Sequence, residues 1–390
     1  MANAAPVTRI VAVGWHTSSF PLYLTHIDVV LRYTWIGLCL GFPYDIDSAR
    51  LENALRGLLR MYTSLAGSLV QQLQPHRVFS GEEAPFKLQI TQLSDGCALG
   101  ISISHLLADA ESLGQMLADL SSLYNGQGLP QRQETRLGMQ QIISKAAGLL
   151  SSEAQSSGRC LEKLRDEILH SSVAKQAGVD YISHTDVTCA LLWVIKEASS
   201  GNHLKDGVHQ AISNIMGLRS SGFSDLKPNP YFGNALSIAL IQPLPLTQST
   251  GDCGLRDTVA AAACAVRLAT RTFRSDVASS VKQLFAALPA LVQAEVLQNP
   301  DMNPFKGCCL DVVSWRNMYN KVDFGQGPPV LTLGGALPTL INISFIMEGP
   351  GRDGVLCTLW FSEVDFERLR ASQLLHQVAP EATFVKGHPS

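Results

Sequence analysis

The sequence is poor in charge and has no marked excess of either sign. Only 16% of its 390 residues are charged, and 33 acidic side chains nearly balance 30 basic ones, leaving a formal net charge of −3. A nucleic-acid-binding protein would need a surplus of Lys and Arg to neutralise phosphates, so that class is not expected. A disordered chain is excluded too, because 46% of the residues are hydrophobic and can build a large buried core.

Regular cysteine spacing and long apolar runs are also missing. Nine cysteines are scattered without a CxxC pair, which favours small buried hydrophobic residues over a disulfide framework or a zinc site; no metal is expected.

The longest apolar stretch, Val29–Phe42, is interrupted by Arg32 and is too short to span a bilayer as a helix. Met1–Gly14 lacks the features of a signal peptide. We expect a cytoplasmic protein without a membrane span, and we take it to be a monomer.

Strand and helix patterns mix along the whole chain, which predicts an α/β protein with two comparable lobes. The apolar spacing predicts strands at 29–42, 99–104, 211–216, 235–241, 330–333, 340–347 and 355–361. It predicts helices at 49–62, 109–123, 185–198, 255–272 and from 364 onward. Between 127 and 180 the composition becomes polar and the apolar spacing loose. We predict an N-terminal domain over 1–150, a crossover linker over 151–180 and a C-terminal domain over 181–390.

His105 and Asp109 form an HxxxD element where a predicted strand ends. His105 continues the apolar face of the strand 99–104, and a histidine partly removed from water favours the neutral form that can accept a proton near pH 7. Asp109 could bond either the ring or the local backbone. Such a pattern arises by chance about half the time in a chain of this composition. A core histidine beside an aspartate that caps the next helix is therefore an equal alternative.

Two further motifs stand later in the chain. The segment 323–327 reads DFGQG, a pattern expected by chance only about four times in a thousand such chains, although a glycine-rich turn closing a strand is a simple alternative. The segment 231–235 reads YFGNA and opens a predicted strand.

Together and in this order, these three motifs resemble those of the BAHD acyltransferase family. Members of that family carry HxxxD near the end of the first third, a YFGN-like segment in the middle and DFGWG in the last part. The resemblance continues over 51–69, where a leucine-rich helix is followed by LAGSL, in the segment 182–193, and in the pair Ser314-Trp315 ahead of DFGQG. It covers most of the chain, from about Thr25 to the end.

The resemblance implies a two-domain fold like that of chloramphenicol acetyltransferase, with an active-site channel between the domains. Acyl-CoA would enter as a co-substrate from one side, and a small acceptor, such as a natural product with a hydroxyl or amine, from the other. His105 would be the general base that deprotonates the acceptor, which then attacks the thioester without a covalent acyl-enzyme. No permanently bound cofactor is implied.

The resemblance also implies roles for other residues. Asp109 would support the catalytic loop without touching the substrate. A structural motif would comprise four residues, within which we expect Asp323 to pair with the arginine: Asp323, Gly325, Gly327 and Arg219. Four more residues are candidates for lining the substrate channel: Gln326, Ser314, Trp315 and Asn234.

Two other features are candidates for binding phosphates. Arg267, Arg271 and Arg274 lie at helical spacing and could meet the phosphates of CoA, although a solvated helix face is the favoured interpretation. The pair Gly334-Gly335 lacks the Lys-Ser/Thr of a phosphate-binding loop and is expected to form a turn.

Three departures from the family pattern keep alternatives open. Ala110 follows HxxxD where glycine is usual, Gln326 replaces the tryptophan of DFGWG, and the chain is short, as in the divergent fungal and microbial natural-product branch. The fold could instead serve a cyclase or isomerase that uses His105 as a base, or a non-catalytic binding module. A condensation domain, which takes acyl groups from carrier proteins, would usually carry a second histidine where Ser104 stands.

Overall fold

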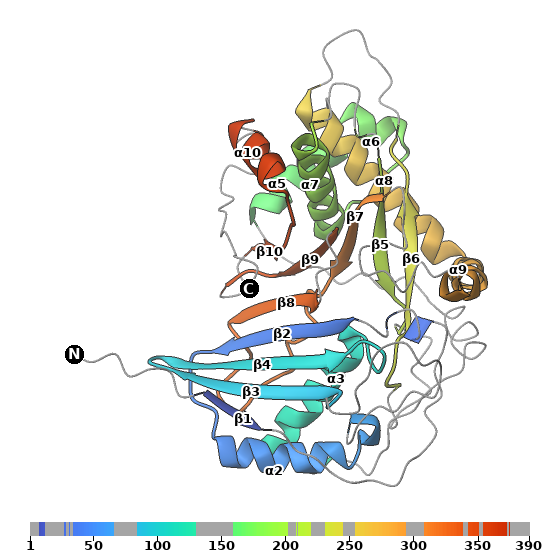
Figure 1. The fold of residues 1–390 in the computed structure, drawn as a ribbon. Helices are drawn as coiled ribbons and strands as arrows, with labels where there is room; N and C mark the ends of the chain where they lie inside the picture. Colours follow the sequence, from blue (N-terminus) through green and yellow to red (C-terminus); the bar gives the residue numbers. More distant parts are fainter. Residues whose placement is uncertain are drawn as a thin grey trace.

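The computed structural model describes the greater part of the chain as two packed lobes, each built on a five-stranded sheet (Figure 1). The predicted mixed α/β architecture is confirmed. The described residues are 8–11, 27–28, 31, 34–65, 84–129, 159–201, 208, 210–219, 231–244, 254–293, 308–337, 342–350, 354–372 and 374.

The first sheet is antiparallel throughout, in the order β1-β3-β4-β2-β8. Its strands are β1 (Thr8–Val11), β2 (Trp35–Phe42), β3 (Phe86–Leu93), β4 (Gly96–Ser104) and β8 (Leu331–Leu337). Helices α2 (Ser48–Leu59) and α3 (Ala110–Tyr124) pack together on one face, and the short 3₁₀ helix η1 spans Thr63–Leu65.

The second sheet is mixed, in the order β10-β9-β7-β5-β6, with β7 parallel to both of its neighbours. Its strands are β5 (Ala211–Gly217), β6 (Leu236–Ile241), β7 (Cys308–Ser314), β9 (Ile343–Glu348) and β10 (Val355–Cys357). The helices of this lobe are α5 (Arg159–His170), α6 (Ser172–Gln176), α7 (His184–Ser199), α8 (Leu255–Ser275), α9 (Val277–Gln293) and α10 (Glu363–Ala371). No helix in the described part of the chain combines the length and apolar character needed to cross a membrane.

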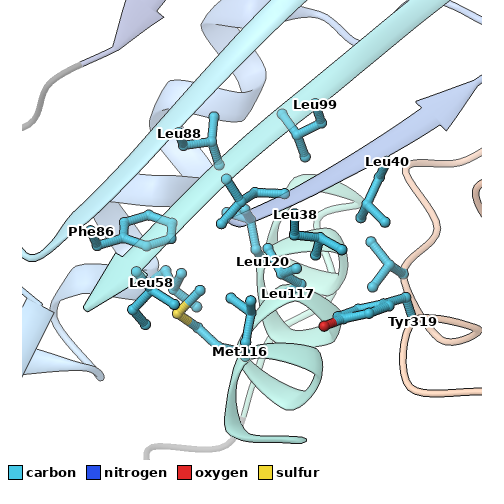
Figure 2. Packing of buried hydrophobic residues seen from close by; sticks show 14 of the residues in the cluster. Leu38, Leu40, Leu58, Phe86, Leu88, Leu99, Met116, Leu117, Leu120 and Tyr319 are labelled. Carbon is cyan, nitrogen blue, oxygen red and sulfur yellow. The ribbon is translucent and has the colours of Figure 1, made fainter. Parts of the chain in front are cut away.

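The core of the first lobe follows directly from the two periodicities of its elements. Along β2, every second side chain is buried, as expected for a sheet with one face against helices. Helix α3 presents Leu113, Met116, Leu117 and Leu120 at spacings of three and four, all with no exposed surface, which matches one stripe of an α-helix. Figure 2 shows Met116, Leu117 and Leu120 packed near Leu38 and other residues of the sheet.

Strand β8 comes from the last third of the chain, yet it completes the first sheet by pairing with β2, with Gly335 opposite Gly37. It also contacts β9 of the second sheet, at the boundary between the lobes (Figure 1). The prediction of a turn at Gly334-Gly335 is therefore wrong. A glycine at 334 leaves room for the ring of Trp315, since a Cβ there would lie 2.1 Å from a ring carbon.

Other sequence predictions differ from the structure mainly at element boundaries. The predicted strand 29–42 begins only at Trp35, because Thr34 closes a turn by donating its backbone N–H to Leu31. Helices α5 and α6, which lie in the predicted crossover linker 151–180, pack against α7 and α8. The division into domains at 1–150 and 181–390 stays a prediction.

Adding a methyl group beneath Trp315 should destabilise the fold. We expect Gly334→Ala to lower the free energy of unfolding by about 1–3 kcal/mol, the usual cost of overpacking, measured by urea denaturation. Gly335→Ala is the matched control, because its Cβ would meet nothing within 4 Å. Equal stabilities of the two variants would contradict this account of Trp315.

Candidate active site

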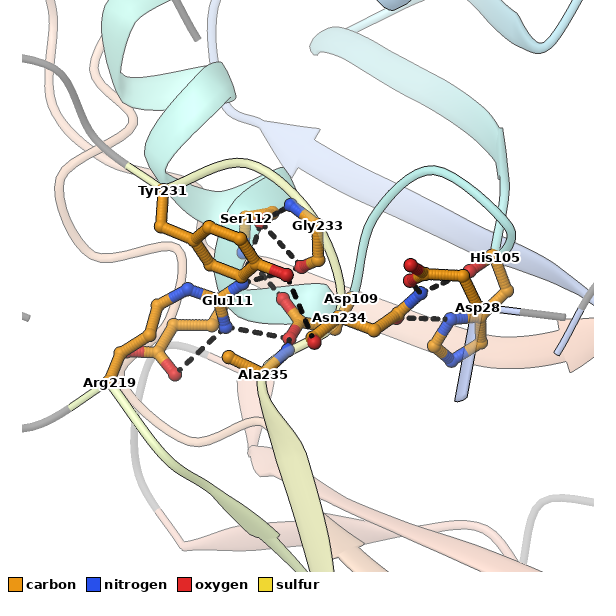
Figure 3. A network of polar contacts seen from close by, with 10 residues as sticks. All are labelled: Asp28, His105, Asp109, Glu111, Ser112, Arg219, Tyr231, Gly233, Asn234 and Ala235. Carbon is orange, nitrogen blue, oxygen red and sulfur yellow. Dashed lines mark hydrogen bonds and ion pairs between the residues drawn. The ribbon is translucent and has the colours of Figure 1, made fainter. Parts of the chain in front are cut away.

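His105 lies in the turn that follows β4, with its ring close to the start of β6 in the second sheet (Figure 3). Its backbone N–H donates to the carbonyl of Thr34 at 2.8 Å, which holds the turn. Its ring Nδ1 lies 3.0 Å from Oδ1 of Asn234. The ring is partly exposed, and Nε2 makes no hydrogen bond to any residue that the structure describes.

Burial lowers the pKa of His105 below its ordinary value, and this effect outweighs the opposing influence of the Asp109 and Asp28 charges and of nearby hydrogen bonds. The neutral ring is therefore the dominant form at pH 7. A neutral histidine with one unbonded nitrogen is able to accept a proton from a molecule placed beside it.

Asp109 points away from the ring and into the backbone that surrounds it. One carboxylate oxygen caps α3 by accepting from the N–H of Ser112 at 2.9 Å. The other accepts from Nη1 of Arg219 at 2.6 Å and from the N–H of Ala235 at 2.8 Å. Of the alternatives that the sequence left open, Asp109 thus bonds the backbone and caps the helix, and it makes no hydrogen bond to the ring of His105.

Arg219 joins three segments at this point, and the predicted pairing with Asp323 is wrong. Besides Asp109, its guanidinium donates to Oγ of Ser112 at 2.8 Å and to the carbonyl of Gly233 at 2.6 Å. It also lies against the ring of Tyr231, 5.1 Å from the centroid. Figure 3 shows how these contacts gather the start of α3 and the segment 231–235 around one cation, whose side chain is 11% exposed.

Asp323 is occupied at the opposite end of α3. Its Oδ1 accepts from the backbone N–H groups of Gly325 and Gly327, at 2.7 and 2.9 Å, and its carbonyl accepts from the side chain of Asn125, the residue that follows α3. Because α3 has 15 residues, it separates Asp323 from Arg219 by about 22 Å at 1.5 Å per residue.

The DFGQG segment is a tight turn that packs against the first lobe. Gly325 and Gly327 have φ angles of 104° and 109°, which side chains rarely tolerate. Phe324 is buried edge-on against Phe42 and Tyr124, with ring centroids 5.5 and 5.2 Å apart. The simpler interpretation of the motif, a glycine-rich turn, describes what the structure contains.

The four candidate channel residues lie in four different environments. Asn234 is fully buried against His105, and Trp315, only 4% exposed, packs on Phe345 in the core; their roles in a substrate channel stay predictions. Ser314 is half-buried at the end of β7. Gln326 is exposed on the turn at the far end of α3 from His105.

The sequence interpretation missed two residues of the site. Asp28 is 1% exposed and accepts a hydrogen bond from Asn234, and Ser112 bridges Arg219 and Gly233. A signal for Asp28 was present, because it is a single carboxylate within the apolar run 27–31, where an ionised group needs a partner. Ser112 offers no such signal.

Arg267 is not part of a phosphate-binding face. It is buried, and it pairs with Asp186, whose side chain completes the capping box at the start of α7; its guanidinium also lies 4.6 Å from the centroid of Tyr181. Arg271 is exposed and Arg274 half-buried. Among the described residues, no group of three or more His, Cys, Asp or Glu is placed to hold a metal ion.

Comparison with known families gives a match between residues 70–142 and the Transferase family model. The matched segment contains β3, β4, the HxxxD element and α3. No curated protein matches the chain by sequence.

Solved structures resemble almost the whole chain despite low sequence identity. TRI101 of F. sporotrichioides, complexed with coenzyme A and T-2, has a TM-score of 0.62 at 13% identity, over 92% of this chain and 99% of that chain. Vinorine synthase has a TM-score of 0.58 at 14% identity, over 93% and 96%. The first condensation domain of the CDA synthetase has a TM-score of 0.56 at 14% identity, over 94% and 98%. The predicted resemblance to BAHD-type acyltransferases and the predicted fold are confirmed.

Removing the Arg219 guanidinium should be costly because it leaves the Asp109 carboxylate buried without its charge partner. We expect Arg219→Ala to lower the free energy of unfolding by about 3–5 kcal/mol, measured by chemical denaturation. Arg56→Ala is the control, since Arg56 pairs with Glu52 on an exposed helix face and should cost under about 1 kcal/mol. Similar losses in the two variants would contradict a central role for Arg219.

Proposed function

We propose that this protein transfers an acyl group from acyl-CoA to a hydroxyl or amine of a small acceptor molecule, with His105 as the general base. The observation that carries the proposal is the state of His105: its ring is partly exposed, its Nδ1 is held by Asn234, and its Nε2 makes no hydrogen bond to a described residue. The family match around HxxxD and the likeness to TRI101 with coenzyme A bound support acyl-CoA as the donor.

In this proposal the reaction needs one proton acceptor and no covalent intermediate. Nε2 of His105 removes the proton from the acceptor hydroxyl or amine as its oxygen or nitrogen attacks the thioester carbonyl. The carbon–sulfur bond then breaks, and the imidazolium returns the proton to the departing CoA thiolate. Most of the remaining rate acceleration would come from holding the two substrates in line. Asp109 supports the loop through α3 and Ala235 without meeting the substrate.

The main rivals share the fold and differ in the acyl donor or in the reaction. A condensation domain resembles this chain nearly as well as TRI101 does. Such a domain would usually carry a second histidine just before the first, and here that position is Ser104, which is fully buried. One of the departures that kept a cyclase or isomerase open, Gln326, lies at the far end of α3 from His105. A cytoplasmic location, a monomeric state and a place in natural-product metabolism stay predictions of the sequence.

The direct test is to incubate the purified protein with a panel of acyl-CoAs and candidate acceptors and follow the products by mass spectrometry. We expect free CoA to appear with an acylated product, and His105→Ala to reduce turnover by about 10²–10⁴-fold. His170→Ala is the control, because His170 is exposed on α5 and bonds only its own helix.

Three outcomes would contradict the proposal. An isolable acyl-enzyme would exclude direct transfer between bound substrates. Use of carrier-protein thioesters in place of acyl-CoA would indicate condensation chemistry. Conversion of a substrate without consumption of acyl-CoA, if lost in His105→Ala, would indicate a cyclase or isomerase.

The lowered pKa of His105 makes a prediction about pH. The base acts only when neutral, so activity should be constant around pH 7–8 and should fall as the pH drops through the folded-state pKa, which lies below the ordinary value of about 6.5. We expect the acidic limb of a plot of kcat/KM against pH to lie below pH 6.5. An acidic limb above this value, in an assay shown to be limited by chemistry, would contradict the assignment of a buried neutral base.

A further inference from the structure

The side chain of Asn234 is enclosed by three polar groups whose roles can be worked out one by one. Its Nδ2 lies 2.7 Å from Oδ1 of Asp28 and 2.7 Å from the backbone carbonyl of His105. Its Oδ1 lies 3.0 Å from Nδ1 of the His105 ring. Figure 3 shows the three residues as a chain of contacts from Asp28 to the ring. Asp28 is 1% exposed and Asn234 has no exposed surface.

Only one orientation of the Asn234 amide satisfies these neighbours. An ionised carboxylate and a backbone carbonyl accept hydrogen bonds and cannot donate them, whereas an amide nitrogen has two hydrogens to give. The nitrogen must therefore face Asp28 and the His105 carbonyl. In the flipped amide, an oxygen would meet two acceptors at hydrogen-bond distance within a buried site, which is strongly unfavourable.

This orientation decides which nitrogen of His105 carries the proton. With its nitrogen directed at Asp28, Asn234 presents only an oxygen to the ring, and that oxygen can only accept. Nδ1 must then be the donor. Because a neutral imidazole carries a single N–H, Nε2 is left with a free lone pair.

Asp28 is held in place by its own neighbour in the sequence. Ile27 is 3% exposed and belongs to a small apolar cluster with Leu218, Tyr231 and Ala235. The cluster connects Ile27, and with it Asp28, to the residues on either side of Asn234. Asp28 and Asn234 are therefore anchored to the same packed unit, although they are 206 residues apart.

We infer that Asp28 is a positioning residue that acts through Asn234 to fix neutral His105 in the tautomer with Nδ1 protonated, so that Nε2 is available as the base. The inference rests on the proposed function, in which Nε2 removes the acceptor's proton. In the other tautomer, Nε2 would present an N–H to the acceptor and could not take its proton. The contribution of Asp28 to turnover comes from selecting the tautomer, without contact with substrate.

The tautomer can be measured directly and without any substrate. Protein labelled with ¹⁵N-histidine gives distinct ¹⁵N shifts for protonated and unprotonated ring nitrogens, and His105→Ala identifies the signals of His105. At a pH where the ring is neutral, we expect Nδ1 to be protonated and Nε2 unprotonated in the wild-type protein. A protonated Nε2 in the wild type would overturn the inference, and this measurement requires no variant of Asp28.

The role of Asp28 is tested by two substitutions and a control. We expect Asp28→Ala to shift the His105 signals toward the tautomer with Nε2 protonated and to lower kcat by the same factor as the Nδ1-protonated population falls, about 10-fold, with little change in KM. Asp28→Asn keeps an oxygen that can accept from Asn234 and should retain the wild-type tautomer and most of kcat. Asp119→Ala, which removes a buried carboxylate bonded to Tyr62 in the first lobe, should leave the His105 signals unchanged.

The two proposals can fail separately. A folded Asp28→Ala variant that keeps the single wild-type tautomer and full kcat would overturn the inference even if acyl transfer is found. If Asp28→Ala does not fold, Asp28→Ser, which keeps a smaller acceptor, is read by the same two criteria. Conversely, the predicted tautomer and its loss in Asp28→Ala, in a protein that transfers no acyl group, would retain the inference and remove the proposed function.

Discussion

The site depends on one buried ion pair, between Arg219 at the end of β5 and Asp109 at the start of α3. Each partner would be costly to bury alone, and each also binds backbone groups of the segment 231–235. The pair thus locks the end of the first lobe's central strand to the second lobe at the place where Asn234 meets His105. The geometry of the His105 ring is a consequence of this contact between lobes, because neither lobe alone contains both residues.

The fold could be predicted from the sequence to a large extent because its elements have strong periodicity. The alternation of 99–104 and the stripe of α3 are local features, and the structure places both elements as expected. Strand β3, Phe86–Leu93, has the same alternation and was overlooked. Helix α9 was not predicted either, and its Pro289 is a residue that normally interrupts a helix. The place of β8 could not be foreseen, because pairing with β2 is set by tertiary packing around Trp315 and leaves no local mark.

The residues of the candidate site were predicted better than the contacts between them. His105, Asp109, Arg219 and Asn234 were all singled out and do lie together, but the ion-pair partner of Arg219 was misassigned. Motif order places residues in the same region, whereas the choice of ion-pair partner depends on which end of α3 each group occupies. Asp323 lies at the C-terminal end of α3, and Arg219 lies at its N-terminal end. Spacing along the chain carries no information on this point, since both residues are distant from α3 in sequence.

The pairing of β8 with β2 has a consequence for how the chain folds. Strand β2 has partners on both sides only once residues 331–337 have been synthesised and brought back across nearly 300 positions of sequence. During synthesis, the first sheet would present β2 as an open edge, which is a template for pairing with other chains. Contacts of such long range also slow folding. The first sheet is therefore completed late, once residues 331–337 have returned to pair with β2.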